Sequence, residues 1–390
     1  MEESYLVEAI LGSEELLRSY RNRSFWKGQV DPRKLQSIFS WHRLNELLAT
    51  HRITNDRLRL SLADDYQTAN MLAFRPGRDQ FGRPTDVLSI SALHRLMGLG
   101  VTGVLEATQE LIPPLEVLTS EISTRLHARS SANAFFSFGS SSGFGPHNDD
   151  HDVIVVQFCG QKQWEFFRTS ASPKKAKVGD LAAPGTADKG DRIVIQEGDV
   201  LFVPKGTWHD VAALNTPSLH ITISIVFPTI SDLVSWLLMQ RRYSIPFQDI
   251  RSDDDPDNVA NLCADFLHTE IKSDIVPTFL SEYYSRYSAH RINPAFPHLN
   301  RVTPGDSFIR LPYTFIPVHD DERTATRVIS ALGRKHCISE LEHEILKHLS
   351  HKAPSTLKDI QSFDPKHRPD TVGTIKAIEG LLDKGLISKM

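Results

Sequence analysis

The chain has 390 residues, of which 40% are hydrophobic, a length typical of two or three domains with ample material for a core. Its formal net charge of −4 lacks the cationic excess of nucleic-acid-binding domains, so we expect no nucleic acid partner. The three cysteines are widely separated, which argues against a disulfide framework and against a cysteine zinc site.

The start of the chain predicts the compartment. It has no basic segment followed by a continuous apolar stretch, so no secretory signal is expected. No run approaches the roughly 20 apolar residues that a transmembrane helix needs. We therefore expect a cytoplasmic protein without a membrane partner.

The first third of the chain predicts helices packed on a β core. Residues 1–50 contain amphipathic helical patterns, and residues 57–62 alternate strictly between polar and apolar side chains, as in a strand. A helical stripe then runs from Pro113 to Leu126. It leads into a predicted strand that contains Asn133.

A His-x-Asp triplet at His147 and Asp149 carries the first chemical signal. In an extended segment, residues i and i+2 project to the same side, so both side chains would enter one cavity. Asp150, His151 and Asp152 compete for the same role. By alternation His151 lies on the His147 face, so periodicity leaves that choice open.

A second element supplies another histidine. Residues 200–203 predict a buried strand, residues 204–206 predict the turn that ends it, and His209 follows. A β-barrel could bring this end beside the first segment. Two imidazoles and one carboxylate form the ligand set that holds a non-haem Fe(II) on one face and leaves the opposite face open. The pattern predicts an oxygenase site in which His209 joins His147 and Asp149, or one of the competing neighbours in their place, as metal ligands.

The rest of the chain predicts a loop and two helix-rich regions. Residues 169–190 are rich in Ser, Ala, Pro, Lys and Gly, and form either a lid over the site or an inert insertion. Residues 230–287 carry amphipathic helices with many aromatic side chains. From residue 301, the order helix, short helix, helix and strand is typical of a winged helix. Its balanced charges argue against a DNA-recognition helix.

The middle third of the chain resembles the JmjC-domain ribosomal oxygenases, a branch of the cupin superfamily of Fe(II)- and 2-oxoglutarate-dependent protein hydroxylases. The resemblance rests on motifs that occur in the family's order, in residues 133–138, 143–153, 157–164, 204–209 and 218–224. One departure is Asn148, where the family often has an aromatic residue. Asn148 would lie away from the iron chemistry, so this departure affects the expected identity of the substrate and not the expected reaction.

The resemblance implies a mainly β fold with a barrel core, a double-stranded β-helix of the cupin/JmjC type, with flanking helices. Residues 1–229 would form the catalytic domain, residues 230–300 a helical dimerisation module, and residues 301–390 a winged-helix-like domain that serves protein contacts. A homodimer is therefore expected.

The resemblance also assigns the co-substrate site. It makes Lys162 the residue that pairs with the distal carboxylate of 2-oxoglutarate, and it places Ser224 and Asn133 around that pocket. A dicarboxylate in a dry barrel needs a fixed cation, since a buried unpaired carboxylate is costly. Without the resemblance, Lys162 would be interpreted as a solvated lysine between two glutamines. Thr222 and Ser137 share the strand faces of Ser224 and Asn133 and stay open as alternatives.

The implied activity is hydroxylation of a protein side chain, with an arginine or histidine of a ribosomal protein as the family's expectation. Fe(II) would be the cofactor, and 2-oxoglutarate and O2 the co-substrates. Removal of an N-methyl group, or oxidation of another peptide or a metabolite, would use the same site. The alternative from another functional class is a non-catalytic cupin that acts as a binding or regulatory protein.

Overall fold

The computed structural model contains two compact units, residues 1–126 with 130–226 and residues 127–129 with 227–390. The structure describes residues 2–61, 66–139, 143–168, 189–240, 254–272, 275–286, 301–311, 316–321, 326–331, 334–350, 353–363 and 371–390. The predicted loop at 169–190 therefore lies almost wholly outside the described residues. The predicted division into three domains stays a prediction.

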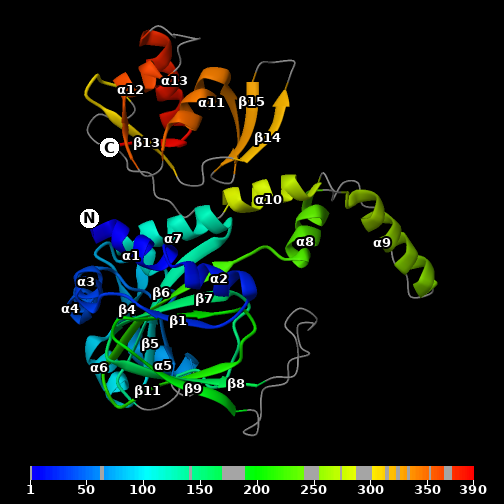
Figure 1. Ribbon diagram of the computed structural model, residues 1–390. Helices are drawn as coiled ribbons and strands as arrows, with labels where there is room; N and C mark the ends of the chain where they lie inside the picture. The colour runs from blue at the N-terminus through cyan, green and yellow to red at the C-terminus, as the bar shows by residue number, and fades with distance from the viewer. Residues whose placement is uncertain are drawn as a thin grey trace. The chain divides into compact units, whose positions relative to one another are not determined.

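The first unit is built on a seven-stranded sheet (Figure 1). In spatial order its strands are β1 (Trp26–Gln29), β10 (Asp199–Val203), β7 (Asp152–Cys159), β12 (Ser218–Val226), β6 (Arg129–Ser137), β5 (Thr102–Leu105) and β2 (Leu58–Ser61). Every residue of β7 and of β10 is buried, which explains why both strands are nearly continuous runs of apolar residues. The strands predicted at residues 57–62 and 200–203 are confirmed.

A second, three-stranded sheet completes the barrel core. It consists of β11 (His209–Ala213), β8 (Gln161–Phe167) and β9 (Lys189–Gln196), with β8 in the centre. The antiparallel register of β11 and β8 pairs His209 with Phe166 and Ala213 with Lys162. Side chains from both sheets line one cavity. A separate hairpin is formed by β3 (Phe74–Arg78) and β4 (Pro84–Leu88).

Helices flank the sheets of this unit. They are α1 (Glu2–Leu11), α2 (Glu14–Asn22), α3 (Pro32–Ile38), α4 (Trp41–Thr50), α5 (Tyr66–Ala73), α6 (Ile90–Gly98) and α7 (Pro113–Leu126), with a short 3₁₀ turn at Thr108–Glu110. Side-chain caps from Ser13, Asp31 and Ser40 begin α2, α3 and α4. Helix α7 packs against α1 and β12. The helices predicted within residues 1–50 and at 113–126 are confirmed by α1 to α4 and by α7.

The second unit begins with α8 (Ile230–Gln240), α9 (Pro256–Glu270) and α10 (Ile275–Arg286). The predicted helix, short helix and helix appear as α11 (Glu340–His348), α12 (Leu357–Ser362) and α13 (Thr371–Asp383), followed by β18 (Ile387–Lys389). Apolar side chains of these helices, such as Ile345 of α11 and Leu381 of α13, form a core together with Phe308. The winged-helix assignment stays a prediction.

Two small sheets complete the second unit. One consists of β17 (Ser355–Thr356), β13 (Ser307–Arg310) and β18, and the other of β14 (Ile316–Asp321), β15 (Thr326–Ala331) and β16 (Arg334–Ser339). Sequence reasoning did not predict the β14–β16 sheet. In the described part of the chain, no helix combines the length and hydropathy needed to cross a bilayer.

Candidate metal centre

Two segments far apart in the sequence meet at one end of the cavity. The amide of His147 donates to the carbonyl oxygen of His209 at 2.9 Å. In return, the amide of His209 donates to the carbonyl oxygen of His147 at 2.8 Å. In the turn before His209, the Gly206 amide also donates to the Asp149 carbonyl oxygen at 2.9 Å. Gly206 has a φ of +80°, which suits a glycine.

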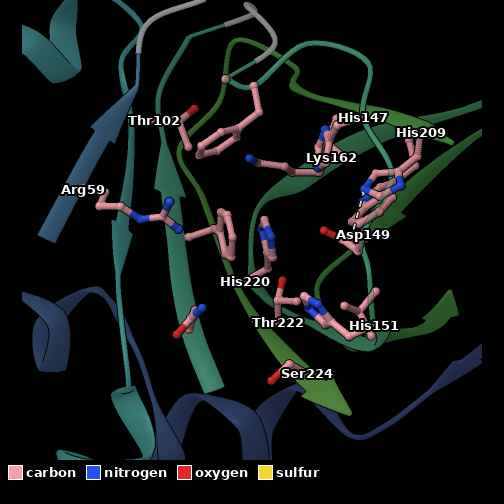
Figure 2. A pocket seen from close by; sticks show the side chains of 17 residues that line it. Arg59, Thr102, His147, Asp149, His151, Lys162, His209, His220, Thr222 and Ser224 are labelled. Carbon is pink, nitrogen blue, oxygen red and sulfur yellow. Dashed lines mark ion pairs between the residues drawn. The ribbon is translucent and has the colours of Figure 1, made fainter. Parts of the chain in front are cut away.

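This arrangement corrects the prediction that His147 and Asp149 lie on a regular strand. The His147–His209 pair is an isolated bridge, and β7 begins only at Asp152. The carbonyl oxygen of Asp149 accepts its hydrogen bond from Gly206 in the turn and not from a neighbouring strand. His209 follows the predicted turn, as the sequence suggested, and it begins β11. The three side chains nevertheless converge (Figure 2).

The geometry of the three side chains suits a divalent metal ion. One potential ligand atom from each of His147, Asp149 and His209 lies within 4.8 Å of the other two. The His209 Nε2 atom is 3.8 Å from the Asp149 Oδ2 atom. These are nitrogen and oxygen donors, the set expected for a non-haem iron site with open positions.

Both histidines are oriented by the backbone. His147 Nδ1 lies 2.9 Å from the Gly145 carbonyl oxygen, and His209 Nδ1 lies 2.9 Å from that of Thr207. A carbonyl oxygen can only accept, so each Nδ1 carries the proton and each Nε2 keeps its lone pair for a metal. Burial lowers the pKa of His209, although the charge of Asp149 acts in the opposite direction. The effect of burial favours the neutral, metal-binding form of His209.

The structure distinguishes Asp149 from its neighbours. The Asp150 side chain is 93% exposed and lies 2.8 Å from His151 Nδ1. Asp152 is buried, forms an ion pair with Arg23, and accepts a hydrogen bond from the Lys205 amide at 2.7 Å. Asp152 is thus occupied in structural contacts. His151 does line the cavity, but it is not part of the converging set.

Lys162 points into the same cavity from β8 (Figure 2). It is only 3% exposed, and no hydrogen bond or ion pair joins its ammonium group to another described residue. Burial lowers the pKa of its ammonium group to about 8. The interpretation as a solvated lysine is therefore wrong, because Gln161 is exposed while Lys162 faces inward. A buried cation without a protein partner suits an anionic ligand.

Ser224 and Asn133 also line the cavity, but each has a protein partner. Ser224 Oγ lies 2.8 Å from Ser131 Oγ, and Asn133 Oδ1 accepts from the Ala107 amide at 3.0 Å. Of the alternatives, Thr222 lines the cavity, whereas Ser137 is buried and is not among the described lining residues.

Sequence reasoning also missed other lining residues, among them Trp164, His220 and Arg59. The Trp164 ring stacks on that of His209, with ring centroids 5.1 Å apart. Strand alternation could have found two of them. Trp164 lies two residues after Lys162 on β8, and His220 lies two residues before Thr222 on β12.

Comparisons with known proteins identify a domain family and a fold that this chain resembles. Residues 109–233 match the JmjC domain family. The bifunctional lysine-specific demethylase and histidyl-hydroxylase NO66 of Drosophila simulans is 26% identical over 204 residues, 50% of this chain and 23% of the relative. NO66 of Dictyostelium discoideum is 30% identical over 112 residues, 27% of this chain and 22% of the relative. The matched region thus spans less than a quarter of either relative.

Solved structures extend the likeness to nearly the whole chain. The ribosomal oxygenase YcfD of Escherichia coli aligns over 96% of this chain and 97% of its own, with a TM-score of 0.55 and 17% identity. A structure of YcfD in complex with cobalt and 2-oxoglutarate aligns over 94% and 95%, with a TM-score of 0.54 and 17% identity. At this identity the likeness shows a shared fold. The resemblance seen in the sequence is confirmed: residues 109–233 match the JmjC domain family, and the chain has the fold of YcfD.

Proposed function

We propose that the protein is an Fe(II)- and 2-oxoglutarate-dependent oxygenase that hydroxylates a protein side chain. One observation carries this proposal: a single cavity holds both the converging His147, Asp149 and His209 side chains and the buried Lys162, whose ammonium group has no partner among the described residues. The first group suits a metal ion and the second suits an anion. A co-substrate with a metal-chelating end and a distal carboxylate matches both.

Each residue has a defined part in this reaction. His147 and His209 offer neutral Nε2 atoms and Asp149 a carboxylate, so they would hold Fe(II) on one face. Bound Fe(II) supplies activation of O2, with 2-oxoglutarate as the reductant. One oxygen atom enters succinate as carbon dioxide leaves, and the other enters a C–H bond of the target as a hydroxyl group. Lys162 would pair with the distal carboxylate, and the cavity walls exclude water.

The names of the relatives support a protein substrate. YcfD is described as a ribosomal oxygenase, and NO66 as a lysine demethylase and histidyl-hydroxylase. We therefore infer a ribosomal protein as the substrate and an arginine or histidine as the target. The NO66 name keeps demethylation of an N-methyl group as the second candidate activity.

Mass spectrometry of products tests both candidates. The protein would be incubated with Fe(II), 2-oxoglutarate, O2 and ribosomal proteins, and succinate and peptide masses would be measured. Hydroxylation predicts a gain of one oxygen on a target peptide, together with formation of succinate. Loss of a methyl group would favour the demethylase. Absence of any oxygen-dependent conversion of 2-oxoglutarate would refute an oxygenase and favour a binding protein.

The protonation of Lys162 predicts a pH dependence. Burial lowers the pKa of Lys162 to about 8, so the ligand-free protein holds the charged ammonium below that pH and loses it above. We expect the KM for 2-oxoglutarate to rise as the pH increases through about 8. Initial rates measured from about pH 7 to about pH 9 at several 2-oxoglutarate concentrations would check this. A KM that stays constant over this range would contradict it.

The predicted homodimer is retained as part of this proposal. None of the residues of α9 is buried, and Leu262 on this helix is 41% exposed. Met239 on α8 is 70% exposed. Apolar side chains of this kind favour a protein partner, and a second copy is the simplest. Sedimentation should give about twice the chain mass of 43.9 kDa, and a concentration-independent monomer would refute the dimer.

A further inference from the structure

His220 is a buried polar residue of the cavity to which the proposed function assigns no part. It lies on β12, in the large sheet, and is 3% exposed. Its ring stacks on that of Phe135, with centroids 4.9 Å apart and planes 5° from parallel. His220 lines the cavity, yet its Nδ1 atom is buried without a hydrogen-bond partner among the described residues. A buried polar group of this kind needs a physical explanation.

The environment of His220 decides where its proton lies. Burial lowers the pKa of His220 well below its usual value, and the charge of Lys162 lowers it further, so the ring is neutral. A neutral imidazole carries one N–H group. A buried N–H without an acceptor is rarer and more costly than a lone pair without a donor. This places the proton on Nε2 and makes His220 a hydrogen-bond donor.

Lys162 and His220 reach the cavity from different walls. Lys162 projects from β8 of the three-stranded sheet, whereas His220 projects from β12 of the seven-stranded sheet (Figure 2). They are close enough for the charge of one to affect the other. An ammonium group is a point charge that directs a carboxylate weakly, whereas an N–H from the opposite wall adds a fixed direction. A ligand bound between these walls would meet both groups, so together they would form a two-sided anion site.

We propose that His220 is a binding residue for the distal carboxylate of 2-oxoglutarate, which it holds together with Lys162. This inference rests on the proposed function. Lys162 supplies the charge, and His220 supplies an N–H group that directs the carboxylate and so aims the keto-acid end at His147, Asp149 and His209. Ser224 and Asn133 are poorer candidates for this part, since each already bonds to the protein.

The test compares two ligands that differ only at the distal end. The affinities of 2-oxoglutarate and of 2-oxopentanoate, which has a methyl group in place of that carboxylate, would be measured without oxygen on the metal-loaded protein. Loss of one hydrogen bond to the carboxylate should weaken 2-oxoglutarate about tenfold in His220→Leu. Binding of 2-oxopentanoate should not change. His220→Gln, which keeps an N–H donor, should recover part of the loss.

Controls separate a binding role from a structural one. Thermal melting would show that each variant is folded, and His94→Gln, at an exposed position on α6, controls for the loss of a histidine. Equal weakening of both ligands in His220→Leu would mean that His220 only packs the cavity, and would overturn the inference. Unchanged 2-oxoglutarate affinity would overturn it as well. A wild-type protein that binds no 2-oxoglutarate would overturn the proposed function and this inference together.

Discussion

Replacing Asp149 with alanine is expected to abolish succinate formation, and His147→Ala and His209→Ala should do the same. Each variant leaves two protein ligands in a site that needs three to hold the metal with an open face. Changes to residues that merely orient a ligand already cost about 10- to 100-fold in metal affinity or activity. Loss of a ligand should therefore cost more than about 100-fold. Turnover and metal content, measured side by side, would show it.

The fold should survive these substitutions. The bridge between His147 and His209 uses main-chain atoms, which alanine retains. Asp150→Ala is the matched control, because it removes an adjacent carboxylate that is almost fully exposed. It should keep nearly full activity and metal content. Full turnover by Asp149→Ala would contradict the assignment and make another carboxylate the ligand.

Local sequence rules identified the candidate ligands but not the reason for the choice among them. The spacing of His147 and Asp149 implied a shared direction, and the structure brings both side chains to His209 without a regular strand. The choice between Asp149 and Asp152 depends on Arg23, which forms an ion pair with Asp152 from 129 positions away. No local pattern contains that contact. Only the folded chain decides which carboxylate faces the cavity.

Polar cavities also hide strands from sequence patterns. The inner face of β8 presents Lys162 toward a ligand cavity, and its neighbours Gln161 and Gln163 are polar as well. The usual alternation of apolar and polar residues is therefore absent around Lys162. His220 shares the strand alternation of Thr222 and Ser224 on β12, but a single histidine on a strand does not by itself indicate a ligand-binding residue, so it was overlooked. In contrast, helices such as α11 were predicted because their apolar faces pack on a dry core.

Replacing Lys162 with alanine should raise the 2-oxoglutarate requirement steeply while barely changing iron affinity. The ammonium is buried and has no hydrogen bond or ion pair with another described residue, so the distal carboxylate of the co-substrate would be its main partner. Loss of a charge-assisted bond in such a site costs about 2 to 5 kcal/mol, or roughly tenfold to a few thousandfold in affinity. The KM for 2-oxoglutarate and the Kd for the metal would be measured together.

A matched lysine variant makes this result specific. Lys347→Ala removes a lysine that is 53% exposed and pairs with Glu344 on α11. The KM of this variant for 2-oxoglutarate should equal that of the wild type. The pH dependence gives a second check, because the rise in KM above about pH 8 should vanish in Lys162→Ala. If Lys162→Ala kept the wild-type KM, the distal carboxylate would be bound elsewhere. The two-sided anion site with His220 would then lose its charged half.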